Sequence, residues 1–368
     1  MLSPDTLEGC SDELVELFAE LETAILCDIA RRIARLGKVD DASKWQAKML
    51  RETTGLRQNV DRLLKGYSPK VARALKDAVA EAYKESSATD AAVFTRLAGR
   101  DVSLAFDTAM RATVEKLAGN LSRLTMTTAA QSERLFVAKA NAAYMQTVSG
   151  AFGYAEATKA ACDELAAEGI HAVLYTNGKP VTRTIEAAVR MNVITGISQS
   201  AAVKTLSDCQ ELDCDLVEVS AHAGARPSHE VWQGKVYSIS GKSDKYPPFS
   251  ETGYGEVDGL CGVNCRHSFA PWVEGDPLHW SKEQMSEYAR DKRTIDGETM
   301  SRYEASQKQR EAERNLRYWK RRASCETAGG VDSSSAQAKV SEWSSRVADI
   351  CRQAGFRRDK TREVIGGE

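Results

Sequence analysis

A helical repeat of apolar residues runs through the first 170 residues and constrains the fold more than any other feature. In the segment SDELVELFAELETAILCDIARRIARLG (residues 11–37), apolar side chains recur at spacings of three and four residues, which is typical of an amphipathic helix. Ser11 is a suitable N-cap, and Gly37 is a suitable C-terminal stop. Such a helix must bury its apolar face, so we expect several helices packed against one another.

Further helix boundaries are marked by the same kinds of residue. Ser68 followed by Pro69 predicts a helix start, because proline suits the first helical position. Gly150 and Gly169 predict helix ends.

Length and charge limit the classes of protein to consider. The chain has 368 residues, more than one ordinary core needs, and its formal net charge is -2. It holds no run of eighteen apolar residues, so we expect no membrane span and no membrane partner, and its acidic first residues do not resemble a secretory signal. The nine scattered cysteines are interpreted as mostly reduced thiols.

The pattern changes at Ile170. Two short apolar runs flank Asn177-Gly178, which favours a tight hairpin, and a helix is predicted to follow. From Asp213 to about Glu274, the alternating segments DLVEVSAH and KVYSIS lie among many glycines and prolines. This composition predicts a small antiparallel β element with long loops. After Pro277 the chain is predicted to be helical again and to end in a helical hairpin.

The expected fold class is therefore mainly α with a small α+β central domain. Its antiparallel β element has long Gly/Pro-rich loops and is flanked by helical N- and C-terminal parts. We place the three parts at residues 1–150 (helical), 151–280 (α+β, with a Cys/His cluster) and 281–368 (a basic helical hairpin).

Five cysteines and histidines are candidate metal ligands within 46 residues: His222, His229, Cys261, Cys265 and His267. Zinc takes about four nitrogen or sulfur ligands, and a metal would order this loop-rich region. Their spacing is irregular, which favours a packed cluster without metal over a zinc site. In that case Arg226, Asn264 and Arg266 would brace the loops.

A catalytic cysteine is a third interpretation of this region. Cys265 would be the nucleophile, with His222 or His229 as its base and an acid such as Asp258 to orient that base. No phosphate-binding loop or cofactor fingerprint accompanies it. A zinc-dependent nucleic-acid-binding module is the remaining alternative.

Residues 302–322 form a basic stretch that contains eight basic and three acidic residues. Four arginines recur at spacings of four, three and four: Arg310, Arg314, Arg317 and Arg321. They would share one helical face, which is a candidate contact for DNA phosphates or an acidic partner.

Three long segments resemble the phage minor capsid protein 2 family, which is related to Mu-type head morphogenesis proteins. They are AHAGARPSHEVWQGKVYSISG, YPPFSETGYGEVDGLCGVNCRHSFAPW and TMSRYEASQKQREAERNLRYWKR. The stretch SGAFGYAEATKAACDELAAEG and its continuation are similar to the middle part of that family. The resemblance covers roughly residues 10 to 355.

The resemblance implies a minor structural protein of a tailed-phage or prophage-derived head rather than an enzyme. The implied partners are the portal protein, the major capsid protein or other head proteins, with packaged DNA as a further candidate. The implied location is the virion, after synthesis in the bacterial cytoplasm. In Mu-type relatives the corresponding Cys-rich pieces look like zinc ligands, which here implies His229, Cys265 and His267, with Cys261 or His222 as the fourth.

Overall fold

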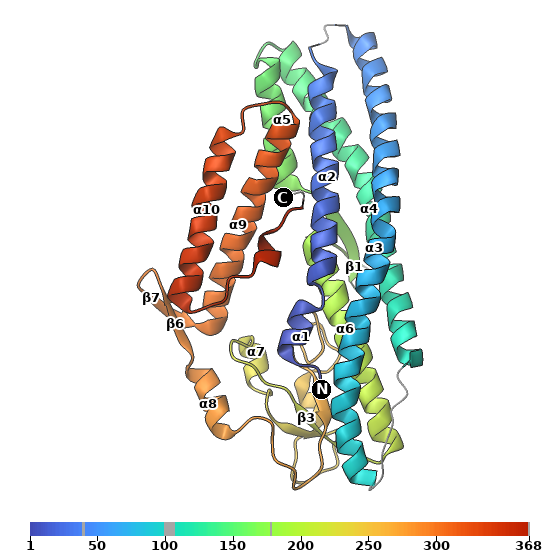
Figure 1. Ribbon diagram of the computed structural model, residues 1–368, viewed down its shortest axis with the longest axis vertical. Coiled ribbons are helices and arrows are strands. Elements are labelled where there is room, and N and C mark those ends of the chain that lie inside the picture. Colours follow the sequence, from blue (N-terminus) through green and yellow to red (C-terminus); the bar gives the residue numbers. More distant parts are fainter. Residues whose placement is uncertain (39–40, 99–106, 177–178, 367–368) are drawn as a thin grey trace. The chain divides into compact units, whose positions relative to one another are not determined.

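The structure is a computed structural model that describes residues 1–38, 41–98, 107–176 and 179–366. Its described part is dominated by helices and carries three small antiparallel sheets, which confirms the expected fold class (Figure 1). None of the helices within these ranges is both long enough and apolar enough to cross a membrane.

The α-helices are α1 (Pro4–Gly9), α2 (Asp12–Leu36), α3 (Ala42–Ala98), α4 (Asp107–Val148), α5 (Tyr154–Glu168), α6 (Ile185–Glu211), α7 (Pro227–Glu230), α8 (Lys282–Arg290), α9 (Arg302–Ala328) and α10 (Ser334–Ala354). Two short 3-10 helices are η1 (Phe249–Thr252) and η2 (Lys360–Glu363). The strands are β1 (His171–Thr176), β2 (Lys179–Thr184), β3 (Leu216–Val219), β4 (Val236–Ser238), β5 (Phe269–Pro271), β6 (Lys292–Ile295) and β7 (Glu298–Ser301).

Glycines end two of the long helices where the sequence predicts it. Helix α2 ends at Leu36 and Gly37 follows with a φ of 63°, while α5 ends before Gly169, whose φ is 62°. Residues with a side chain adopt this left-handed backbone only at a cost, so glycine is favoured there.

The predicted helix start at Ser68 is wrong. Pro69 lies inside the continuous helix α3, which runs from Ala42 to Ala98. A proline inside a helix removes one backbone hydrogen bond, the one to the carbonyl of Lys65. Both residues are exposed, so water can hydrate that carbonyl and the helix continues.

The strands form three separate sheets. Strands β1 and β2 pair antiparallel from His171–Thr184 to Thr176–Lys179, as the predicted hairpin requires; its turn at Asn177-Gly178 lies outside the described residues. The central sheet has the order β4-β3-β5, all antiparallel.

The third sheet corrects the expectation that the chain is purely helical after Pro277. Strands β6 and β7 form a hairpin whose turn residues, Asp296 and Gly297, have φ values of 54° and 79°. Positive φ at both positions is characteristic of a two-residue hairpin turn, for which Asp-Gly is a favoured sequence.

The chain divides into two compact units, each made of three separated segments. Unit 1 comprises residues 1–13, 73–120 and 189–307, and unit 2 comprises residues 14–72, 121–188 and 308–368. Each unit combines stretches that are far apart in the sequence, whereas the predicted three-part division, at residues 150 and 280, uses consecutive segments. That division stays a prediction.

The core of unit 1 surrounds the central sheet. Buried residues from β3, β4 and β5 pack with Phe94 of α3 and with Cys209 of α6. The loop residues Leu260, Cys261 and Cys265 belong to the same apolar cluster. The long loops that the sequence predicts are therefore anchored in the core rather than spread over the surface.

In unit 2, α10 and the part of α9 from Lys308 onward form the predicted antiparallel hairpin (Figure 1). At one end of the pair, the Thr327 hydroxyl donates to the Ser333 Oγ at 3.2 Å. At the other end, the Gln309 amide donates to the carbonyl of Arg357 at 3.5 Å.

Candidate functional site

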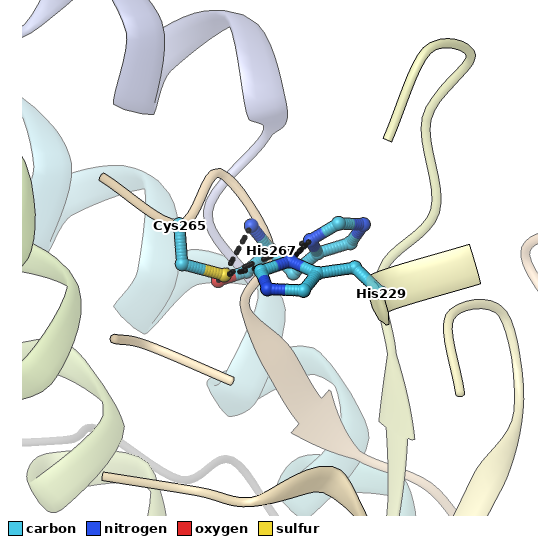
Figure 2. A group of neighbouring side chains, drawn as sticks. All are labelled: His229, Cys265 and His267. Carbon is cyan, nitrogen blue, oxygen red and sulfur yellow. Dashed lines mark hydrogen bonds between the residues drawn. The ribbon is translucent and has the colours of Figure 1, made fainter. Parts of the chain in front are cut away.

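Three of the five candidate ligands come together in unit 1: His229, Cys265 and His267. Figure 2 shows their side chains converging on one point. The Nδ1 atoms of the two histidines are 3.3 Å apart. The Cys265 Sγ lies 3.8 Å from the His229 Nδ1 and 3.6 Å from the His267 Nδ1. We call these residues the His–Cys–His cluster.

Each member is positioned by local backbone structure. His229 lies in the short helix α7, which begins at Pro227. His267 lies two residues before the start of β5. Cys265 follows Asn264, whose φ is 52°. Asparagine tolerates this left-handed conformation better than most residues, and the turn directs the cysteine inward.

The outer nitrogens of the two histidines bind acceptors. His229 Nε2 is 2.7 Å from the carbonyl oxygen of Asp258, and His267 Nε2 is 3.0 Å from the Gln233 Oε1. The Gln233 Oε1 also accepts the backbone N–H of His222 at 3.1 Å, which fixes the orientation of the amide. Both Nε2 atoms must therefore carry the proton, and both Nδ1 atoms present lone pairs to the cluster.

Burial disfavours charge on the three side chains of the cluster. The three residues are only 2%, 2% and 1% exposed, in sequence order. Burial lowers the pKa of His229 and lowers that of His267 well below its ordinary value, while it raises the pKa of the Cys265 thiol. A nucleophilic cysteine needs the opposite shift, toward the thiolate.

His222 and Cys261, the two proposed fourth ligands, lie beside the cluster but outside it. Among the described residues, the group whose ligand atoms all lie within 4.8 Å of one another consists of His229, Cys265 and His267. The His222 Nδ1 contacts the carbonyl of Ala223 at 3.1 Å. Burial, followed by the charge of Arg266, lowers the pKa of His222 to about 4.

Cys261 is completely buried and has a φ of 58°. Its Sγ lies 3.9 Å from the carbonyl oxygen of His267. Burial raises the pKa of this thiol.

The three residues expected to brace the loops make polar contacts in unit 1. Arg226 donates to the carbonyl of Val263 at 2.7 Å, and Arg266 pairs with Glu8 at 2.5 Å. The backbone N–H of Asn264 donates to the Thr195 hydroxyl at 3.2 Å.

The geometry does not favour the catalytic arrangement of Cys265, His229 and Asp258. Asp258 holds the His229 ring through its backbone carbonyl and not through its carboxylate. The base therefore lacks the charged orienting group that the hypothesis requires.

Sequence reasoning missed two residues of this site, Trp232 and Gln233. The indole of Trp232 lies against both histidine rings, with ring centroids 4.6 Å from His229 and 4.8 Å from His267. Both missed residues follow His229 at spacings of three and four, which would have suggested a shared face if α7 had been recognised.

The four arginines of α9 divide into two groups. In unit 2, Arg317 pairs with Glu186 at 3.0 Å, and Arg321 lies 3.4 Å from Glu22 and 3.7 Å from Glu186. We call Glu22, Glu186, Arg317 and Arg321 the Glu–Arg cluster. Arg310 is half-buried and Arg314 is exposed. Contact of this face with DNA or an acidic partner stays a prediction.

The sequence did carry a signal for the Glu–Arg cluster. Glu22 lies four residues after Phe18 and three before Ile25, on the apolar face of α2. An acidic residue at such a position has to be paired when it is buried.

Comparisons with known proteins place the whole chain in context. A sequence profile described as "Phage minor capsid protein 2" matches residues 2–351. A protein of Lactococcus phage LL-H named "Structural protein" is 23% identical over 306 residues, covering 77% of this chain and 78% of its own length.

A second protein with the name "Structural protein", from Lactococcus phage mv4, is 30% identical over 114 residues. The match covers 30% of this chain and 85% of that protein. No solved structure matches the chain.

Proposed function

The chain belongs to the phage minor capsid protein 2 family, and we propose that it assembles into the head of a tailed phage or prophage-derived particle. The observation that carries the proposal is the family match, which extends from residue 2 to residue 351. A phage structural protein is a component of the virion and contacts other head components. We further propose that this chain is a minor component located at the portal vertex and required for head assembly.

The portal protein and the major capsid protein are the partners that we propose. Exposed apolar side chains in unit 2 support a protein partner: Met145 and Val148, near the end of α4, are 64% and 55% exposed, and Phe152 beyond it is 50% exposed. Clustered apolar side chains on a surface often mark a contact with another protein.

Quantitative mass spectrometry of purified particles tests the proposed location. We expect the chain in particles at a copy number far below that of the major shell protein. Absence from particles, or a copy number equal to that of the shell protein, would contradict the proposal.

Cross-linking of the same particles tests the proposed partners. We expect cross-links from unit 2 to the portal protein or to adjacent capsid subunits. In an infection complemented with variants, Phe152→Glu should reduce incorporation. Val203→Glu, at an apolar position in unit 1 that is 62% exposed, is the matched control.

A further inference from the structure

The His–Cys–His cluster has an electrostatic problem that the described protein groups do not solve. Two imidazole lone pairs face each other across 3.3 Å, since each outer nitrogen holds its proton against an oxygen acceptor. The single proton of the Cys265 thiol can serve only one of them. The other lone pair is then buried without a donor, which is costly.

Neighbouring cations do not supply the missing charge by direct contact. Arg226 donates to the Val263 carbonyl, and Arg266 pairs with Glu8. A bound metal cation would satisfy both lone pairs and the sulfur at once.

The separations between the three atoms fit a tetrahedral zinc site. With Zn–N bonds of about 2.05 Å and a Zn–S bond of about 2.3 Å, tetrahedral angles place the nitrogens about 3.3 Å apart and the sulfur about 3.6 Å from each nitrogen. The structure has 3.3 Å between the nitrogens, and 3.6 Å and 3.8 Å from the sulfur to them.

The surroundings match those of zinc-binding histidines in other respects. A ligating histidine usually donates its second N–H to a carbonyl or carboxylate, which fixes the ring and selects the ligating nitrogen. Asp258 and Gln233 provide such acceptors here, at 2.7 Å and 3.0 Å. Two imidazoles and one thiolate are also a donor set that suits zinc.

We propose that His229 Nδ1, Cys265 Sγ and His267 Nδ1 bind one Zn²⁺ ion, and that neither Cys261 nor His222 is a ligand. The metal joins helix α7 to the loop before β5, two parts of unit 1 that are 36 residues apart at His229 and Cys265. The inference concerns this chain alone and does not depend on the proposed place in the head.

Metal analysis of the full-length protein tests the proposal directly. We expect about one zinc per chain after purification without chelator. X-ray absorption at the zinc edge should show a single sulfur neighbour at about 2.3 Å, with the remaining neighbours nitrogen or oxygen. A second sulfur would mean that Cys261 is a ligand and would overturn the three-ligand assignment.

Two cysteine variants separate a ligand from a neighbour. Cys265→Ser should lose the zinc, whereas Cys261→Ser, at an equally buried thiol six residues from His267, should retain it. If Cys265→Ser does not fold, the wild-type spectrum and Cys261→Ser still decide. A wild-type protein that holds no zinc after refolding with equimolar Zn²⁺, or that holds copper in its place, would refute the proposal.

Discussion

Two buried polar clusters in this chain differ in how their charges and lone pairs are paired. The Glu–Arg cluster of unit 2 contains two carboxylates and two guanidinium groups, so its opposite charges are paired within the chain. The His–Cys–His cluster of unit 1 contains three electron-pair donors and no cation in direct contact among the described groups. The charges of the first cluster are paired within the chain, whereas the proposed zinc ion would supply the cation that the second cluster lacks.

The difference shows how each region obtains its order. Unit 2 joins long helices, whose backbone hydrogen bonds are satisfied within each helix, and the ion pairs of the Glu–Arg cluster link side chains of α2, α6 and α9. The site in unit 1 is built from a four-residue helix and loops, which have little structure of their own. A metal contributes most in such a region, since its binding energy adds directly to folding.

Loss of the metal is expected to be the largest effect. Cys265→Ser should lower the free energy of unfolding by more than about 5 kcal/mol, because binding of structural zinc contributes on the order of 10 kcal/mol. Denaturant titration with and without a strong zinc chelator measures this. The chelator should destabilise the wild type and leave the variant unchanged.

Cys261→Ser is the control for this prediction. It buries a hydroxyl in place of a thiol and should cost only about 1 to 3 kcal/mol. If the two variants lost equal amounts of stability and the wild type did not respond to the chelator, the His–Cys–His cluster would not depend on a metal, and the proposed contrast with the Glu–Arg cluster would be wrong.

Breaking the Glu–Arg cluster should have the next largest effect. Arg321→Ala leaves Glu22, which is 1% exposed, without its guanidinium partner. Burial already raises the pKa of Glu22, and the positive charge of Arg321 opposes that rise. We expect a loss of about 3 to 5 kcal/mol in thermal or chemical unfolding, as is usual when one partner of a buried pair is removed.

The matched control lies on the same helix. Arg314 is exposed, so Arg314→Ala should change stability by less than about 0.5 kcal/mol. A loss in Arg321→Ala no greater than this would show that the buried charges are balanced by something other than Arg321.

The loop that carries the cysteines should be sensitive to added bulk. A Cβ atom on Gly259 would lie 1.9 Å from the carbonyl oxygen of Gly253, and one on Gly262 would lie 2.3 Å from that of Glu256. Because these contacts are with backbone, the loop itself must move. Gly259→Ala should cost about 1 to 3 kcal/mol and reduce the zinc content measured by elemental analysis. Full zinc occupancy in that variant would show that the loop and the metal site are independent.

Local sequence patterns predicted much of the fold. The apolar repeat of α2 and the stop at Gly37 both follow from short-range physics, as do the strands β3 and β4. The hairpin β6–β7 is not among the expected elements although Asp296-Gly297 is a strong turn signal, because its two strands are short and lie between charged helical segments.

Residue types and spacing predicted the candidate site only as a set of five cysteines and histidines, whereas the family resemblance already singled out His229, Cys265 and His267. The sequence offered five cysteines and histidines, and the structure brings three of their ligand atoms together. That selection depends on the left-handed backbone at Asn264 and on the carbonyl of Asp258, and neither contribution is encoded in the spacing of the cysteines and histidines. The partners of Arg317 and Arg321 in α9 could not be predicted from spacing either, since Glu22 and Glu186 are remote in sequence.

A glycine in the helical region offers the smallest and opposite effect. Gly66 lies inside α3, is exposed, and a Cβ atom there would meet nothing within 4 Å. Alanine lowers the backbone entropy of the unfolded chain and favours the helix, so Gly66→Ala should stabilise the protein by about 0.5 to 1 kcal/mol. The midpoint of denaturant unfolding should rise while its slope stays constant. A destabilised variant would mean that the nearby Pro69 gives this stretch of α3 a backbone conformation that alanine does not tolerate. The helices of unit 2 would then be less regular than the ion pairs between them suggest.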